Sequence, residues 1–89
     1  MKTKRKTKNA FFIEVCHTDG NKQTTLFFGK ITKRQYTDTA TALQETHAHT
    51  HEQKEQAKDK DGNKIIIFKN SFTSGNEVIN LYFRKVFYN

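Results

Sequence analysis

The chain has 89 residues, a length that fits one domain and excludes an assembly of separate catalytic and regulatory domains. Hydrophobic residues make up 34% of it and charged residues 28%, and the mean hydropathy is −0.89, so any apolar core is small. Lys and Arg outnumber Asp and Glu by 16 to 9, and the resulting formal charge of +7 favours a polyanionic partner.

The single cysteine, Cys16, excludes an intrachain disulfide and is typical of a reducing compartment. A core of this size contributes only about 3–5 kcal/mol unless a metal or a second subunit supports it, and we therefore expect a homodimer. The longest apolar runs, residues 10–13 and 65–68, are far shorter than the roughly 20 residues that span a bilayer. We expect no membrane segment, no signal peptide and a cytoplasmic location.

Basic residues are concentrated at the N-terminus, where no acidic residue accompanies them within residues 1–9. The five are Lys2, Lys4, Arg5, Lys6 and Lys8. Such a block cannot bury apolar surface, so residues 1–9 are predicted to be a disordered basic arm and residues 10–89 a single domain. The arm either keeps the chain soluble or contacts phosphates.

Alternating apolar residues predict strands at residues 10–17 and 24–30, joined by a tight turn around Gly20. Thr32 followed by Gln35 is a capping-box pair, which predicts a helix from Lys33 to about residue 58. The segment at residues 61–63, containing Gly62, ends that helix. Residues 64–70 and 77–88, with a turn around Gly75, are the last two predicted strands.

These elements predict an α+β fold in ββαββ order, with a four-stranded, largely antiparallel sheet and one long helix on one face. The helix's apolar stripe ends near His47, so its polar second half is expected to overhang the sheet. A competing interpretation makes residues 37–41 and the alternating His47, His49 and His51 into strands.

Ten of the eleven aromatic residues lie outside the predicted helix. A single sheet face covered by one helix cannot bury all ten of these side chains. The face packed under Tyr36 and Leu43 is predicted to hold Phe11, Ile13, Leu26, Phe28, Ile79, Leu81, Phe83 and Phe87. Left on the open face are Phe12, Phe27, Phe68, Tyr82 and Tyr88, with Lys64 and Arg84. That face is a subunit interface, an aromatic and basic platform for nucleobases, or part of a sheet that curls over a second core.

Three potential metal ligands fall on one side of the predicted helix, because His47, His51 and Glu55 are spaced four residues apart. They are weak candidates, since a structural zinc ion needs four ligands closed around it and one helix presents only a row. His49 points elsewhere, and we expect no cofactor.

Cys16 and His17 point to opposite faces of a strand, so the histidine cannot activate the thiol, and no glycine-rich phosphate loop is present. The chain is therefore predicted to be non-catalytic. We predict a small basic protein that binds nucleic acid or a nucleoprotein complex. The arm residues expected to contact phosphates are Lys2, Lys4, Arg5, Lys6 and Lys8. On the sheet, the residues expected to take part in binding are the basic Lys64, Arg84 and Lys85, with Tyr82 or Tyr88 stacking on bases.

Two other functions remain open from the sequence. One is an inhibitor or adaptor, of the kind that phages and mobile elements encode, which binds and blocks a host protein. The other is a metal-binding protein built on the histidine cluster.

Overall fold

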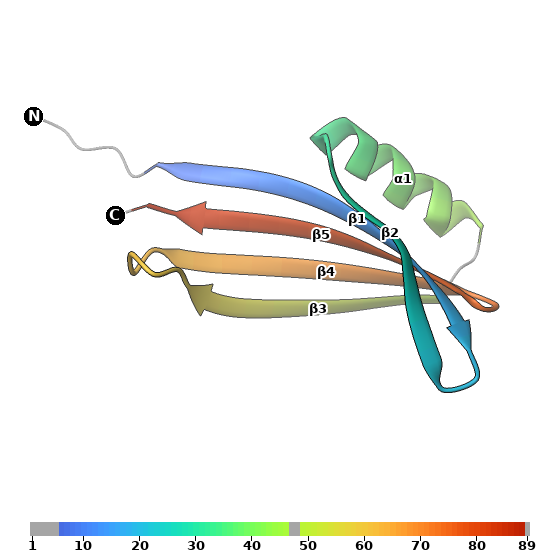
Figure 1. Cartoon of the computed structure of the whole chain (residues 1–89). Coiled ribbons are helices and arrows are strands. Elements are labelled where there is room, and N and C mark those ends of the chain that lie inside the picture. The colour runs from blue at the N-terminus through green and yellow to red at the C-terminus, as the bar shows by residue number, and fades with distance from the viewer. Residues whose placement is uncertain (1–5, 47–48, 89) are drawn as a thin grey trace, which may run out of the picture.

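The computed structural model describes residues 6–46 and 49–88 and shows one antiparallel sheet with one helix against it (Figure 1). The molecule is elongated, with dimensions of 55 × 26 × 19 Å. In chain order the elements are β1 (Thr7–Asp19), β2 (Lys22–Ile31), α1 (Lys33–Glu45), β3 (His49–Lys58), β4 (Lys64–Ser74) and β5 (Glu77–Phe87).

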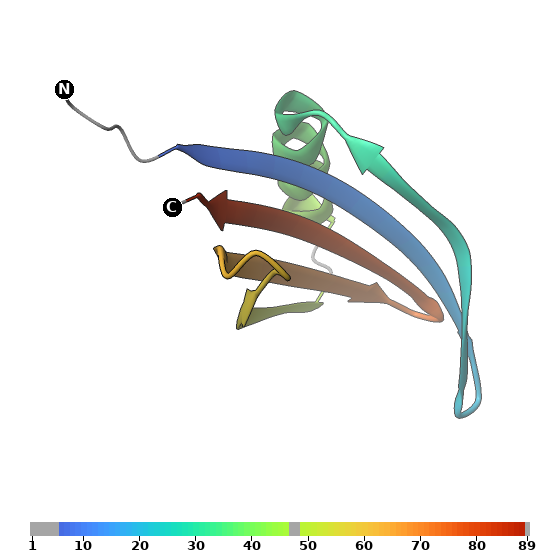
Figure 2. The ribbon, with the colours of Figure 1, turned by 60° about the vertical axis from the view of Figure 1, so that its left-hand side comes forward.

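The strands lie in the order β2-β1-β5-β4-β3, and every neighbouring pair is antiparallel. β2 and β3 therefore form opposite edges, and the connection between them has to cross the whole sheet. The thirteen residues of α1 extend about 20 Å. Four strand spacings extend about 19 Å, so the helix is just long enough for the crossing. Figure 2 shows α1 on one side of the sheet, whose strands bend along their length.

α1 covers only one half of the face against which it packs, which we call the helix-side face. The Tyr36 ring lies 5.1 Å from the Phe11 ring, and Leu43 borders the same hollow as Phe72 and Ile79. In Figure 1, α1 lies toward the end of the sheet that holds the β4–β5 turn, and the strands continue past it toward the termini. In the covered half Phe72 is 2% exposed and Leu81 0%, while the other buried hydrophobic residues, Ala10, Cys16 and Val86, lie on the opposite face of the sheet.

The predicted four-stranded sheet in ββαββ order is wrong, because the order is ββαβββ and residues 49–58 form a fifth strand. α1 ends at Glu45, with Thr46 as its C-cap, and β3 pairs with β4 from His49 opposite Thr73 to Lys58 opposite Lys64. A helix continued beyond Leu43 would bury no apolar side chain larger than that of alanine, whereas the strand gains a ladder of hydrogen bonds. The expected helical overhang is therefore absent from the described residues.

The competing interpretation was correct for part of this region. His49 and His51 lie in β3, but residues 37–41 are helical. His47 lies outside the described residues.

The predicted helix start and the predicted turns are confirmed. The backbone N–H of Gln35 donates to Thr32 Oγ1 at 3.1 Å, and the Thr32 N–H donates to Gln35 Oε1 at 2.8 Å. Gly20 and Gly75 have positive φ angles of 63° and 60° in the β1–β2 and β4–β5 turns, a conformation that glycine adopts without strain. The turn containing Gly62 ends β3 rather than the helix.

A bulge in β2 changes which side chains share a face. Val15 pairs with Phe27 but Cys16 pairs with Thr25, so Leu26 is the extra residue. Phe28 consequently lies on the uncovered face, which we call the open face, and its predicted place under the helix is wrong. Phe27 takes the helix-side face instead.

Two further predictions about the open face are also wrong. Phe68 pairs with Phe83, whose ring stacks on that of Phe11, so Phe68 lies on the helix-side face. Lys64 lies four residues before Phe68 on the same strand. Side chains an even number of residues apart share a face, so Lys64 is also on the helix-side face.

The N-terminal strand begins inside the predicted arm, because Thr7, Lys8 and Asn9 pair with β5. The Tyr88 N–H also donates to the Lys6 carbonyl at 2.9 Å. Residues 1–5 lie outside the described residues, and the division into arm and domain stays a prediction. No helix in residues 6–46 or 49–88 has the length and apolar character needed to cross a membrane.

Replacing Thr32 with Ala should lower the free energy of unfolding by about 1 kcal/mol, because the first-turn amides lose their acceptor. Urea denaturation followed by circular dichroism measures this loss. The control is Thr37→Ala inside α1, where alanine is the better helix former and stability should be equal or slightly higher. An equal loss in both variants would contradict the role of the cap.

Candidate nucleic-acid interface

The half of the helix-side face that α1 leaves uncovered is built from four adjacent strands, β1, β5, β4 and β3. Pairing in register places twelve side chains there in three rows of four. The rows are Thr7, Phe87, Lys64 and Lys58; Asn9, Lys85, Ile66 and Gln56; and Phe11, Phe83, Phe68 and Lys54. We call these twelve residues the basic surface.

Charge on the basic surface has one sign. Lysine occupies four of its positions, Lys54, Lys58, Lys64 and Lys85, and none of the twelve described residues is acidic. From strand geometry the surface measures about 14 Å along the strands and about 14 Å across them. Four positive charges so close together, with no carboxylate between them, attract anions.

Phenylalanine rings form a ladder across the row of the basic surface nearest α1. The Phe11 and Phe83 ring centroids are 4.9 Å apart with planes at 7°, and those of Phe83 and Phe68 are 5.8 Å apart with planes at 17°. The Lys54 amine lies 5.9 Å from the Phe68 centroid, and Lys85 lies 5.3 Å from that of Phe87. Lys54 and Lys85 therefore each lie beside a phenylalanine ring of the basic surface, at a distance typical of a cation–π contact.

A hollow of about 540 Å³ lies where the basic surface meets the start of α1. Its lining includes Tyr36, Glu52, Lys54, Phe68, Asn70 and Phe83. The Asn70 amide donates to the Tyr36 hydroxyl at 3.2 Å. Burial raises the pKa of Tyr36, so its hydroxyl keeps its proton at neutral pH.

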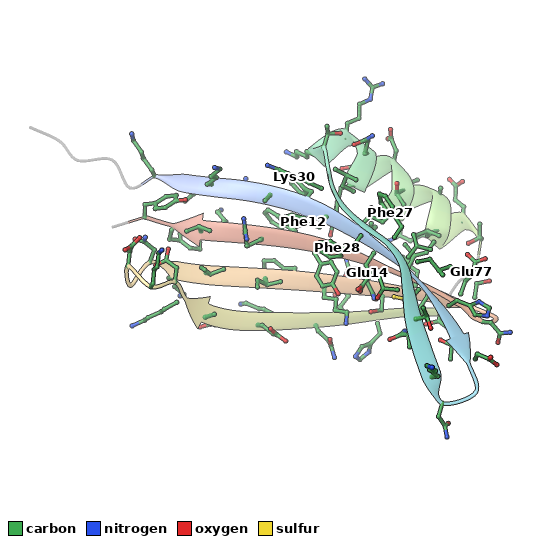
Figure 3. All side chains as sticks on the ribbon, in the orientation of Figure 1. Phe12, Glu14, Phe27, Phe28, Lys30 and Glu77 are labelled. Atoms are coloured by element: carbon green, nitrogen blue, oxygen red, sulfur yellow. The ribbon has the colours of Figure 1, made fainter. Side chains whose placement is uncertain are left out.

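The open face carries a second group of rings and cations. Phe28 lies 5.9 Å from Phe12 and 6.1 Å from Tyr82, measured between ring centroids. Arg84 lies 5.4 Å from the Phe12 centroid and Lys69 lies 5.8 Å from that of Tyr82. Figure 3 shows Phe12 and Phe28 near Glu14, so this group includes a carboxylate.

Glu14 is the centre of a hydrogen-bond network on the open face. Its carboxylate accepts from the Asn80 amide and the Tyr82 hydroxyl, both at 2.9 Å, and from the Thr25 hydroxyl at 3.3 Å. The bond from Asn80 is the main reason that the pKa of Glu14 is lowered. Burial, together with the bond to Glu14, raises the pKa of Tyr82 to about 12. Tyr82 is thereby fixed as part of this network.

The residues that the sequence predicted for binding do not form one surface. Lys64 and Lys85 belong to the basic surface, whereas Tyr82, Arg84 and Lys8 lie on the open face. Two others flank the sheet, since Lys6 precedes β1 and Tyr88 follows β5. Lys2, Lys4 and Arg5 lie outside the described residues.

Sequence reasoning missed Lys54 and Lys58, because both were assigned to the long helix. The signal that could have found them was the strand interpretation of His49 and His51. If that strand is extended to residue 58, its side chains alternate between the two faces, and Lys54 and Lys58 then lie on the same face.

The structure does not place the weak metal-ligand candidates side by side as the helix interpretation did. His51 and Glu55 lie on a strand, where residues four apart are about 13 Å apart along the chain. On the helix that was expected, the same spacing brings side chains within about 6 Å. The described residues contain no group of three or more His, Cys, Asp or Glu that could hold a metal ion, and His47 lies outside them.

Comparison of the chain with protein families, with curated proteins and with solved structures found no match in any of the three. Its function is therefore inferred from the geometry and charge of the described residues.

Replacing Glu14 with Gln should destabilise the protein at pH 7, and this loss of stability should become smaller as the pH falls below 4.5. The folded-state pKa of Glu14 lies below its ordinary value of 4.5, so its ionised form stabilises the fold above that pH. This stabilisation is lost as the pH falls through the folded-state value. Urea denaturation at several pH values measures the difference between the two proteins.

Glu77→Gln is the matched control, because Glu77 is exposed at the start of β5 and lies on the helix-side face, away from the ring group of the open face (Figure 3). Its stability should differ little from that of the parent at any of these pH values. A Glu14→Gln deficit that does not shrink at all as the pH falls below 4.5 would contradict the role of the ionised carboxylate.

Proposed function

We propose that the protein binds single-stranded nucleic acid through the basic surface. One observation carries the proposal. Twelve neighbouring side chains on four strands include four lysines and no carboxylate, although the chain contains nine acidic residues. Lysines in this arrangement bind phosphates and release the counterions that those phosphates hold.

The shape and the aromatic content of the surface favour a single strand over a duplex. The major groove of DNA admits a helix or a two-stranded ribbon, whereas this surface is four strands wide. Phe68, Phe83 and Phe87 lie among the lysines and are partly exposed. Unpaired bases stack on such rings, while the bases of a duplex are already stacked on one another.

The basic N-terminus supports the same proposal. Thr7 lies at one corner of the basic surface, and Lys6 directly precedes it. Three further bases of the predicted arm, Lys2, Lys4 and Arg5, precede Lys6 in the sequence and add to the positive charge at this end of the chain.

A triple variant, Lys58→Gln with Lys64→Gln and Lys85→Gln, should flatten the salt dependence of binding to a fluorescent ten-nucleotide oligothymidine. Each lost phosphate contact lowers the slope of log K against log salt concentration by about 0.7 for a single strand, so the expected change is about 2. Fluorescence anisotropy at several salt concentrations measures the slope.

The control triple variant, Lys22→Gln with Lys30→Gln and Lys69→Gln, removes the same charge from residues outside the basic surface. Its slope should change much less. If the control triple flattens the slope as much as the first triple, phosphate binding at the basic surface is contradicted.

A specific observation also favours a protein-binding surface at β2. Leu26, Phe27 and Phe28 are consecutive, lie on an edge strand, and are 64%, 56% and 57% exposed. Within the described residues the buried hydrophobic core is only Ala10, Cys16, Phe72, Leu81 and Val86. We propose that a second copy pairs with β2, because an edge strand offers unpaired backbone groups and a twofold pairing brings the exposed side chains of β2 from both copies together.

Replacing Leu26 with Lys should convert a dimer into a monomer, as measured by sedimentation at micromolar concentration. Leu26 is exposed within one chain, so circular dichroism should show an unchanged fold. His51→Lys places the same charge on the other edge strand and should leave the dimer intact. A parent protein that is monomeric would contradict self-association and favour another protein, the target of an inhibitor or adaptor, as the partner of β2.

A further inference from the structure

The hollow beside the basic surface combines a planar apolar lining with two opposite charges. Phe68 and Phe83 come from the sheet and Tyr36 from α1, so aromatic rings border the space from two elements. Its volume of about 540 Å³ falls within the range of about 300–1,000 Å³ that is usual for small-molecule sites. A planar ring can enter it and contact these side chains.

The two charges lie on neighbouring positions of one strand. Glu52 and Lys54 are two residues apart on β3, so their side chains project from the same face about 7 Å apart. Asn70 lies opposite Glu52 on β4 and contacts the Tyr36 hydroxyl. The polar part of the hollow thus offers an ammonium donor, a carboxylate acceptor and an amide.

We propose that this hollow holds one guanine base of the bound single strand, an inference that rests on the proposed nucleic-acid binding. Guanine presents two acceptors, O6 and N7, which lysine recognises. It also presents two N–H donors, at N1 and the exocyclic amine, which a carboxylate accepts. Lys54 and Glu52 together match both pairs, and the aromatic lining takes the plane of the ring.

The other bases fit this pair of charges less well. Thymine and uracil have no exocyclic amine for Glu52 to accept from. Adenine and cytosine have one, but the ring nitrogen beside it is an acceptor, so neither base presents a ring N–H and an amine together to the carboxylate. The hollow therefore gives the basic surface, which is otherwise indifferent to sequence, a preference at one nucleotide.

The test compares ten-nucleotide oligothymidines that carry a single central guanine, adenine, cytosine or thymine, with binding measured by fluorescence anisotropy at one salt concentration. The guanine oligonucleotide should bind about tenfold more tightly than the all-thymine one. In Glu52→Gln the ratio of the two dissociation constants should fall to about one. Glu55→Gln, the control on the same strand but on the open face, should keep the full ratio.

The outcomes separate this inference from the proposed function. All four oligonucleotides could bind equally while the triple variant of Lys58, Lys64 and Lys85 still flattens the salt dependence of binding. In that case the proposed function stands and the guanine site is wrong. If no oligonucleotide binds, the hollow is tested alone by titrating guanosine monophosphate into isotope-labelled protein and following the Asn70 side-chain amide by NMR. A saturating shift that Glu52→Gln abolishes supports the site, and no shift at millimolar nucleotide overturns it.

Discussion

The placement of β2 and β3 on opposite edges of the sheet is the constraint on which the rest of the structure depends. Because these strands follow one another in the chain, their connection must cross all five strands, and α1 does so in thirteen residues. A helix that crosses the strands covers the width of the sheet but only part of its length. Phe72 and Leu81 are therefore buried under α1, and the remaining half of the same face has no cover.

The two exposed regions of the sheet differ in how their polar groups are used. On the open face, Glu14 binds Asn80, Tyr82 and Thr25, so its charge is held inside a network that also fixes the neighbouring rings. On the basic surface no acidic side chain balances Lys58, Lys64 and Lys85. This contrast is why we assign nucleic-acid binding to the basic surface, although both regions combine rings with cations.

Local signals in the sequence predicted the local features well. Thr32 and Gln35 identified the start of α1, and Gly20 and Gly75 identified two turns, because each depends on neighbouring residues alone. The helix end and the fifth strand could not be predicted this way, since residues 49–58 are polar and adopt a strand only because β4 offers an edge. That error hid Lys54 and Lys58, and the bulge at Leu26 reversed the face expected for Phe28.

The three consecutive isoleucines of β4 provide the most direct test of which face binds nucleic acid. Ile66 lies on the basic surface, whereas Ile65 and Ile67 lie on the open face. Methyl NMR spectra of isoleucine-labelled protein, recorded during addition of a ten-nucleotide oligothymidine, follow all three at once. We predict that the Ile66 methyl signal shifts while those of Ile65 and Ile67 stay in place. Shifts of Ile65 and Ile67 with an unchanged Ile66 would contradict binding at the basic surface.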